Sequence, residues 1–77
     1  MNLTTSSLST GEYIIKMDIK GKRYGTLVIA ATNITKHIAE NIHRTIMMQA
    51  NTYGDKAAIE MYDHYRDHLK QTNHKGF

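Results

Sequence analysis

The pattern of apolar and polar positions changes its period once along the chain. In the stretch EYIIKMDIK, Ile15, Met17 and Ile19 alternate with charged residues, the period of two that is typical of a half-buried strand. Gly21 then supplies a turn, and the stretch RYGTLVIA, which is rich in β-branched residues, predicts the returning strand. We therefore expect a β-hairpin that begins near Tyr13.

The turn determines which hairpin residues share a face. A two-residue loop at Lys20-Gly21 or at Gly21-Lys22 changes the register but leaves the faces the same. The face that we expect to form the core consists of Tyr13, Ile15, Met17, Ile19, Tyr24, Thr26, Val28 and Ala30.

The opposite face of the hairpin is polar near the turn and apolar away from it. Ile14, Leu27 and Ile29 make up its apolar part. A sheet face in contact with water has no reason to carry three such residues, so we expect a cover. The cover would be the N-terminal stretch, through Leu3 and Leu8, or a second copy of the protein.

After the stretch AATN the apolar residues recur at spacings of three and four, which predicts an amphipathic helix. Its apolar stripe consists of Ile34, Ile38, Ile42, Ile46, Ala50 and Tyr53. Thr32 or Asn33 can cap its start, Gly54 suits its end, and Asp55 can cap a second helix. The apolar stripe of the second helix consists of Ala58, Tyr62, Tyr65 and Leu69, widened by Ile59 and Met61.

Two helices joined by so short a turn lie antiparallel and can cover one face of the hairpin. The sequence therefore predicts a small α+β domain in two layers, a β-hairpin followed by two antiparallel α-helices (ββαα). We expect this single domain to span residues 12–71. Residues 1–11, dense in serine and threonine, predict a flexible N-terminal arm, and residues 72–77 predict a frayed tail.

The size and composition of the chain favour self-association. A chain of 77 residues is near the lower limit for a single core, and without cysteine it has no disulfide to stabilise it. A homodimer is the remaining simple means of burying more surface. No stretch approaches the roughly 20 apolar residues that span a bilayer, so we expect no membrane contact and a cytoplasmic location.

The sequence offers no catalytic constellation. Asp63 and Asp67 share a predicted helix face with Arg66 and Lys70, which favours solvated charge pairs over a general acid and base. No cofactor motif is present, and a chain this short has little volume to enclose a substrate. The serines, which lie in the arm where nothing would orient them, are Ser6, Ser7 and Ser9. We therefore expect a non-enzymatic protein without a cofactor.

The stretch HYRDH places His64 and His68 four residues apart on the second predicted helix, where both could ligate a transition metal. Asp67 or His74 is the conceivable third ligand. The metalloprotease motif requires glutamate directly after the first histidine, and this chain has Tyr65 there. Without cysteine or a third ligand at fixed spacing, we expect no metal, and the two histidines are weak candidates.

Basic residues gather on the hairpin. Lys16, Lys20, Lys22 and Arg23 against Asp18 give residues 16–23 a local excess of three positive charges. A two-stranded ribbon can enter the major groove of DNA, so these side chains are the candidate contacts to nucleic acid. The alternative is a solvated turn whose charges keep the sheet edge from aggregating.

Over residues 12–50, the hairpin, its basic tip and the following helix resemble the arm-type DNA-binding domains of phage and transposon integrases. The resemblance rests on no specific motif. It implies a three-stranded sheet, whose third strand could here come only from the N-terminal arm.

The apolar residues left outside the expected core predict a protein interface, because contiguous exposed apolar surface usually marks one. Its candidate residues are Ile14, Leu27, Ile29, Met47 and Met48. We therefore expect a small binding protein that self-associates and contacts a protein partner, in the manner of the accessory or inhibitor factors that phages and mobile elements use against host macromolecules. A small DNA-binding regulator with a basic hairpin tip is the alternative.

The expected core yields a stability prediction. Its central residues are Ile15, Met17, Val28, Ile38, Ile42, Tyr62 and Tyr65. Replacing Ile42 with alanine should lower the free energy of unfolding by roughly 2–5 kcal/mol, since the substitution leaves a cavity. Urea denaturation measures this loss. A value below about 0.5 kcal/mol, the level of a surface substitution, would show that the helix is phased wrongly.

Overall fold

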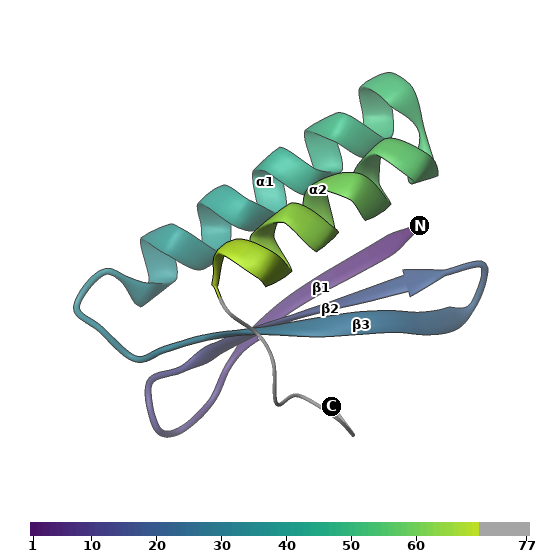
Figure 1. The fold of residues 1–77 in the computed structure, drawn as a ribbon. Coiled ribbons are helices and arrows are strands. Elements are labelled where there is room, and N and C mark those ends of the chain that lie inside the picture. Colours follow the sequence, from purple (N-terminus) through teal and green to yellow (C-terminus); the bar gives the residue numbers. More distant parts are fainter. Residues whose placement is uncertain (70–77) are drawn as a thin grey trace.

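Three antiparallel strands and two helices form the two layers of the structure (Figure 1). The computed structural model describes residues 1–69, so the predicted tail over 72–77 lies outside the described residues. The elements are β1 (Asn2–Ser7), β2 (Tyr13–Ile19), β3 (Lys22–Ile29), α1 (Thr35–Tyr53) and α2 (Asp55–His68). The predicted α+β class, with antiparallel helices after a hairpin, is confirmed, and the sheet has one strand more than predicted.

The additional strand comes from the stretch that was expected to be a flexible arm. Strand β1 pairs with β2, with Leu3 opposite Met17 and Thr5 opposite Ile15. Leu3 is 8% exposed and belongs to the core. The prediction of a flexible arm over residues 1–11 is therefore wrong. Composition suggested a mobile segment, whereas pairing with the edge of β2 satisfies its backbone groups and buries its leucine.

The β2–β3 turn is the first of the two predicted loops. Lys20 and Gly21 both have positive φ, 51° and 81°, and the pair Ile19–Lys22 closes the turn. Positive φ at both central residues is the mark of the type I′ turn, whose twist matches that of a hairpin. Of the two registers left open at the tip of the hairpin, the turn therefore selects the first.

A β-bulge then reverses the predicted faces of β3. Asp18 pairs with Arg23 but Met17 pairs with Gly25, so Tyr24 is an extra residue in β3. Beyond it, every side chain of the strand changes sides, because side chains alternate with a period of two. Leu27 consequently lies opposite Ile15 on the helix-covered face.

The prediction that Leu27 and Ile29 lie on the second face is thus wrong, since both belong to the core, with 0% and 3% exposure. Thr26 and Val28, predicted to face the core, lie on the other side of the sheet instead. There Val28 pairs with Ile14.

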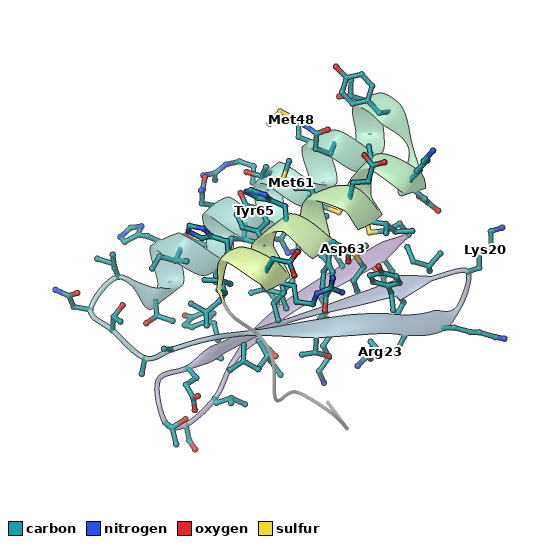
Figure 2. The ribbon with its side chains drawn as sticks, viewed as in Figure 1. Lys20, Arg23, Met48, Met61, Asp63 and Tyr65 are labelled. Atoms are coloured by element: carbon teal, nitrogen blue, oxygen red, sulfur yellow. The ribbon has the colours of Figure 1, made fainter. Side chains whose placement is uncertain are left out.

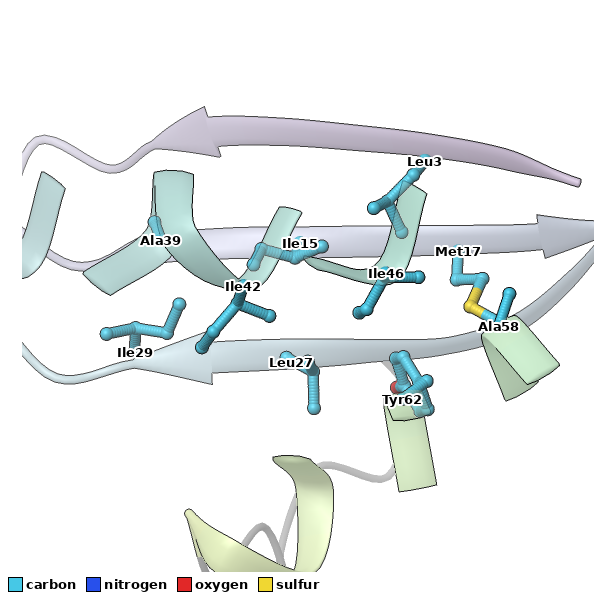
Figure 3. Close-up of a cluster of buried hydrophobic side chains, with 10 residues drawn as sticks. All are labelled: Leu3, Ile15, Met17, Leu27, Ile29, Ala39, Ile42, Ile46, Ala58 and Tyr62. Atoms are coloured by element: carbon cyan, nitrogen blue, oxygen red, sulfur yellow. The ribbon is translucent and has the colours of Figure 1, made fainter. Parts of the chain in front are cut away.

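The core fills the space between the sheet and the two helices (Figure 3). The buried face of α1 includes Ile42 and Ile46 and that of α2 includes Ala58 and Tyr62, as the stripes predicted. The first stripe is shorter than predicted, because Ile34 precedes α1 and is 51% exposed, while Tyr53 at the other end is 72% exposed. The core consists of Leu3, Ile15, Met17, Leu27, Ile29, Ala39, Ile42, Ile46, Ala58 and Tyr62.

Threonine side chains connect the end of β3 to the start of α1. Thr32 Oγ1 accepts a hydrogen bond from the Ile34 N–H at 3.1 Å, and Thr35 Oγ1 donates to the Ala30 carbonyl at 3.0 Å. Gly54, with φ of 95°, ends α1, and its N–H donates to the Ala50 carbonyl at 2.8 Å. The helices therefore begin and end within about two residues of the predicted positions, but the predicted N-caps are wrong. The N-cap of α1 is Ile34 and that of α2 is Gly54, and neither helix of residues 1–69 has a side-chain cap.

Gly25 is required for space rather than for a left-handed backbone, since its φ is not positive. A Cβ at this position would lie 2.9 Å from Cζ of Tyr62, and closer still to the hydroxyl oxygen. Tyr62 is only 2% exposed and belongs to the core. The buried Tyr62 ring of α2 therefore packs directly against the Gly25 backbone, next to the bulge.

Gly25→Ala should lower the free energy of unfolding by about 1–3 kcal/mol, the usual cost of overpacking a core. The cost should be smaller in a Tyr62→Phe background, because that change removes the nearest atom. A double-mutant cycle by urea denaturation measures the coupling. Equal costs in the two backgrounds would contradict the contact.

Candidate functional site

The basic hairpin tip is the first of four surfaces that could carry function. Lys20, Lys22 and Arg23 are exposed, and Lys16 is half-buried. Figure 2 shows Lys20 at the turn and Arg23 in the adjoining part of β3. Arg23 Nε donates to Asp18 Oδ1 at 2.6 Å, so this pair is neutral as a unit. The structure places Lys20, Lys22 and Arg23 at the hairpin tip, whereas Lys16 lies further along β2, opposite Thr26. The three lysines supply the net positive charge of this surface.

The sheet face away from the helices adjoins this tip. Both helices of the described residues cover the same side of the sheet (Figure 1). On the other side, the strand alternation places Thr4 and Ser6 of β1, both exposed, and Lys16 of β2. Ile14 and Thr26 are buried there, at 9% and 7% exposure. The accessible part of this face is therefore polar.

A polar cluster fixes the hairpin to α2. The Tyr24 hydroxyl donates to Asp63 Oδ1 at 2.8 Å, and Arg66 Nη1 lies 3.1 Å from the same oxygen. The rings of Tyr24 and Tyr62 meet edge to face, with centroids 5.3 Å apart. The predicted charge pairing along α2 is confirmed for Asp63 and Arg66. Because Tyr24 and Arg66 both contact Oδ1 of this carboxylate, the cluster is a structural connection.

Burial changes the acidity of both tyrosines in that cluster. It is the main cause that raises the pKa of Tyr24, and the hydrogen bond to Asp63 raises it further. Burial raises the pKa of Tyr62 more strongly, from 10.0 to about 12, although Arg66 lowers it in part. Both phenols are therefore held in their neutral form.

A shallow, open pocket of about 520 Å³ lies between α1 and the part of the sheet formed by β1 and the first residue of β2. Thr5 Oγ1 and His43 Nδ1 share a hydrogen bond of 2.7 Å there, which ties β1 to the helix. The lining residues are Thr5, Tyr13, Glu40, His43 and Arg44. No pattern in the sequence indicated this pocket, because Thr5 belongs to a stretch that was expected to be flexible.

The outer surface of the helix layer carries the remaining apolar candidates. Met47 is half-buried and packs against the core, whereas Met48 is 55% exposed, so the assignment of both to an interface stays a prediction. Met61 and Tyr65 of α2 are half-buried. Figure 2 shows Met48, Met61 and Tyr65 along the helix layer, away from the sheet.

The predicted patch of Ile14, Leu27 and Ile29 does not exist as a surface. Leu27 and Ile29 face the helices, and Ile14 is already buried within one chain. The reason is the bulge at Tyr24, which no period in the sequence reveals. A dimer that buries these three residues is therefore ruled out.

The histidines of HYRDH stack on each other. The ring centroids of His64 and His68 are 6.2 Å apart with an angle of 10° between the planes. Within residues 1–69, no group of three acidic or histidine side chains could hold a metal ion. Of the third ligands considered, Asp67 joins no such group and His74 lies outside the described residues.

Comparisons with known proteins identified no relative of this chain. No protein-family model matches the chain, and neither the curated proteins nor the solved structures give a significant match. Neither helix of the described residues is long and apolar enough to cross a membrane. The candidate surfaces must therefore be weighed on their own chemistry.

The raised pKa of Tyr62 predicts a loss of stability at alkaline pH. Between pH 10 and about 12 the phenol is neutral when folded and ionised when unfolded, so the unfolded state binds fewer protons. The free energy of unfolding should be unaffected below pH 10 and fall by up to about 1.4 kcal/mol per pH unit in that window.

Urea denaturation across this pH range measures the effect. Tyr62→Phe should flatten the slope. Tyr53→Phe, which alters a tyrosine that is 72% exposed, is the matched control. The same slope in both variants would contradict the assignment to Tyr62.

Proposed function

We propose that this protein is non-enzymatic and binds duplex nucleic acid through the β2–β3 hairpin and the adjoining face of its sheet. The observation that carries the proposal is strand β1, which gives a three-stranded sheet with a basic tip and both described helices on the opposite side. The integrase arm-type domains, which the hairpin and helix resemble, imply such a sheet.

The dimensions and charges of the hairpin suit a groove lined by phosphates. The major groove of B-DNA is about 12 Å wide and admits a β-ribbon. Lys20 lies in the tight turn, Lys22 follows it, and both are exposed, while Lys16 lies on the outer face. Arg23 is already paired with Asp18, so it is the weakest of the four contacts. Phosphate contacts by the lysines supply affinity without sequence specificity.

Three free lysines support only modest, salt-sensitive binding. The logarithm of the binding constant should fall with the logarithm of salt concentration with a slope of about −3, from roughly 0.9 per neutralised phosphate. Short polar side chains on the same face, Thr4 opposite Lys16 and Ser6 opposite Ile14, can approach the DNA backbone closely. A role as a small regulator or accessory DNA-binding factor follows.

A protein-binding accessory factor, of the kind that phages and mobile elements use against a host, is the second candidate. Met48 favours it, because this methionine is 55% exposed beside the half-buried Met61 and Tyr65. Methionine is common at surfaces that adapt to a partner. Binding of such a partner would depend on apolar residues of the helix layer, and its affinity would be nearly independent of salt concentration.

Charge reversal at the hairpin tests the nucleic-acid proposal. Lys20→Glu combined with Lys22→Glu should abolish measurable binding to labelled duplex DNA in fluorescence anisotropy, because both phosphate contacts become repulsive. The matched control is Lys36→Glu with Lys56→Glu, which changes the net charge equally at exposed positions on the helices. It should retain most of the affinity.

Equal losses in the two double variants would reduce the interaction to net charge and overturn the hairpin assignment. Wild-type protein that binds no duplex even at low salt would overturn the function. If Met48→Lys instead abolishes binding to a protein partner while the hairpin variant leaves that binding intact, the second candidate is the function.

A further inference from the structure

The outward faces of α1 and α2 form one surface on the side of the molecule away from the sheet (Figure 2). On α1, His37, Arg44 and Met48 are exposed and lie opposite the stripe that faces the core. On α2, the exposed residues include Glu60 and Asp67. This surface is distinct from the basic hairpin.

An apolar centre joins the two helices on this surface. Met48 of α1 is 55% exposed, and Met61 and Tyr65 of α2 are half-buried. Methionine side chains fit irregular surfaces with little strain. The three side chains provide the kind of apolar centre, surrounded by polar residues, that stable interfaces have.

The two helices carry opposite charge. Lys36 and Arg44 against Glu40 give α1 a net charge of +1. Helix α2 has a net charge of −2, from four acidic and two basic residues. These are Asp55, Glu60, Asp63 and Asp67, and Lys56 and Arg66. A surface divided in this way is complementary to itself when one copy is turned over onto another.

The charged residues of α1 and α2 also lie at matching heights along the helix axes. Because α1 and α2 are antiparallel and meet at Gly54, residues at equal sequence distance from Gly54 lie at about the same level. Arg44 is therefore level with His64, and Glu60 and Asp67 lie one helical turn to either side.

We propose that a second copy of the chain packs on this surface, about a two-fold axis parallel to the helices, with α1 of each copy over α2 of the other. The axis brings Arg44 of each copy between Glu60 and Asp67 of its partner and buries Met48, Met61 and Tyr65 at the centre. A two-fold interface must be self-complementary, which this charge division satisfies. The pairing leaves both hairpins on the outside and does not depend on nucleic-acid binding.

Sedimentation equilibrium over a range of protein concentrations tests the pairing. The wild type should be a dimer. Arg44→Glu should raise the dissociation constant at least about tenfold, because like charges then face each other twice across the axis. Combining Arg44→Glu with Glu60→Lys and Asp67→Lys should restore the dimer, since the attraction is exchanged rather than removed.

Lys22→Glu is the matched control, because it changes the charge equally at the hairpin tip and should leave the dimer intact. Met48→Lys should split the dimer through its apolar centre, with circular dichroism unchanged because the residue is exposed. A monomeric wild type would overturn the proposal. So would a dimer that Arg44→Glu leaves intact, or one that the triple charge exchange fails to restore.

Discussion

The contact between the Tyr62 ring and the backbone of Gly25 is the constraint on which the rest of the structure depends. It is formed at the bulge, where one extra residue in β3 changes which side chains face the helices. The bulge gives the core Leu27 and Ile29, its two aliphatic side chains from β3. Without the extra residue, Thr26 and Val28 would face the helices instead, and a hydroxyl would be buried where leucine now packs. The bulge therefore decides which β3 side chains enter the core, and Gly25 leaves the space that Tyr62 occupies beside it.

The same region orients the basic tip. Tyr24, the bulged residue, hydrogen-bonds to Asp63 of α2, and its ring packs against Tyr62. Asp63 in turn is paired with Arg66. The hairpin is thus held to the helix layer by both a packing contact and a polar one, close to the lysines of the turn. A β-ribbon anchored in this way presents its charges in a fixed direction, so less conformational entropy is lost when a ligand binds.

The sequence predicted those features that depend on local period and turn chemistry. Gly21 and Gly54 were placed correctly, and Ile42, Ile46, Ala58 and Tyr62 were correctly placed in the core. The bulge could not be predicted, because RYGTLVIA fits a regular strand equally well and the contact of Gly25 with Tyr62 is distant in sequence. Strand β1 was missed because serine and threonine suit both loops and strand edges. The pocket at His43 was missed for the same reason, since its partner Thr5 lies on β1.

The two-layer architecture separates the two proposed contact surfaces. All ten residues of the core cluster lie between the sheet and the helices, so the exposed residues on the outer side of each layer make a small contribution to stability. Exposed substitutions typically change stability by no more than about 0.5 kcal/mol. The lysines of the hairpin and the Met48 surface of the helices can therefore change independently, although both belong to a domain of only 77 residues. Since Gly25 and Tyr62 lie between these surfaces, a change there would disturb both at once, and a loss of binding caused by such a change would say nothing about either surface.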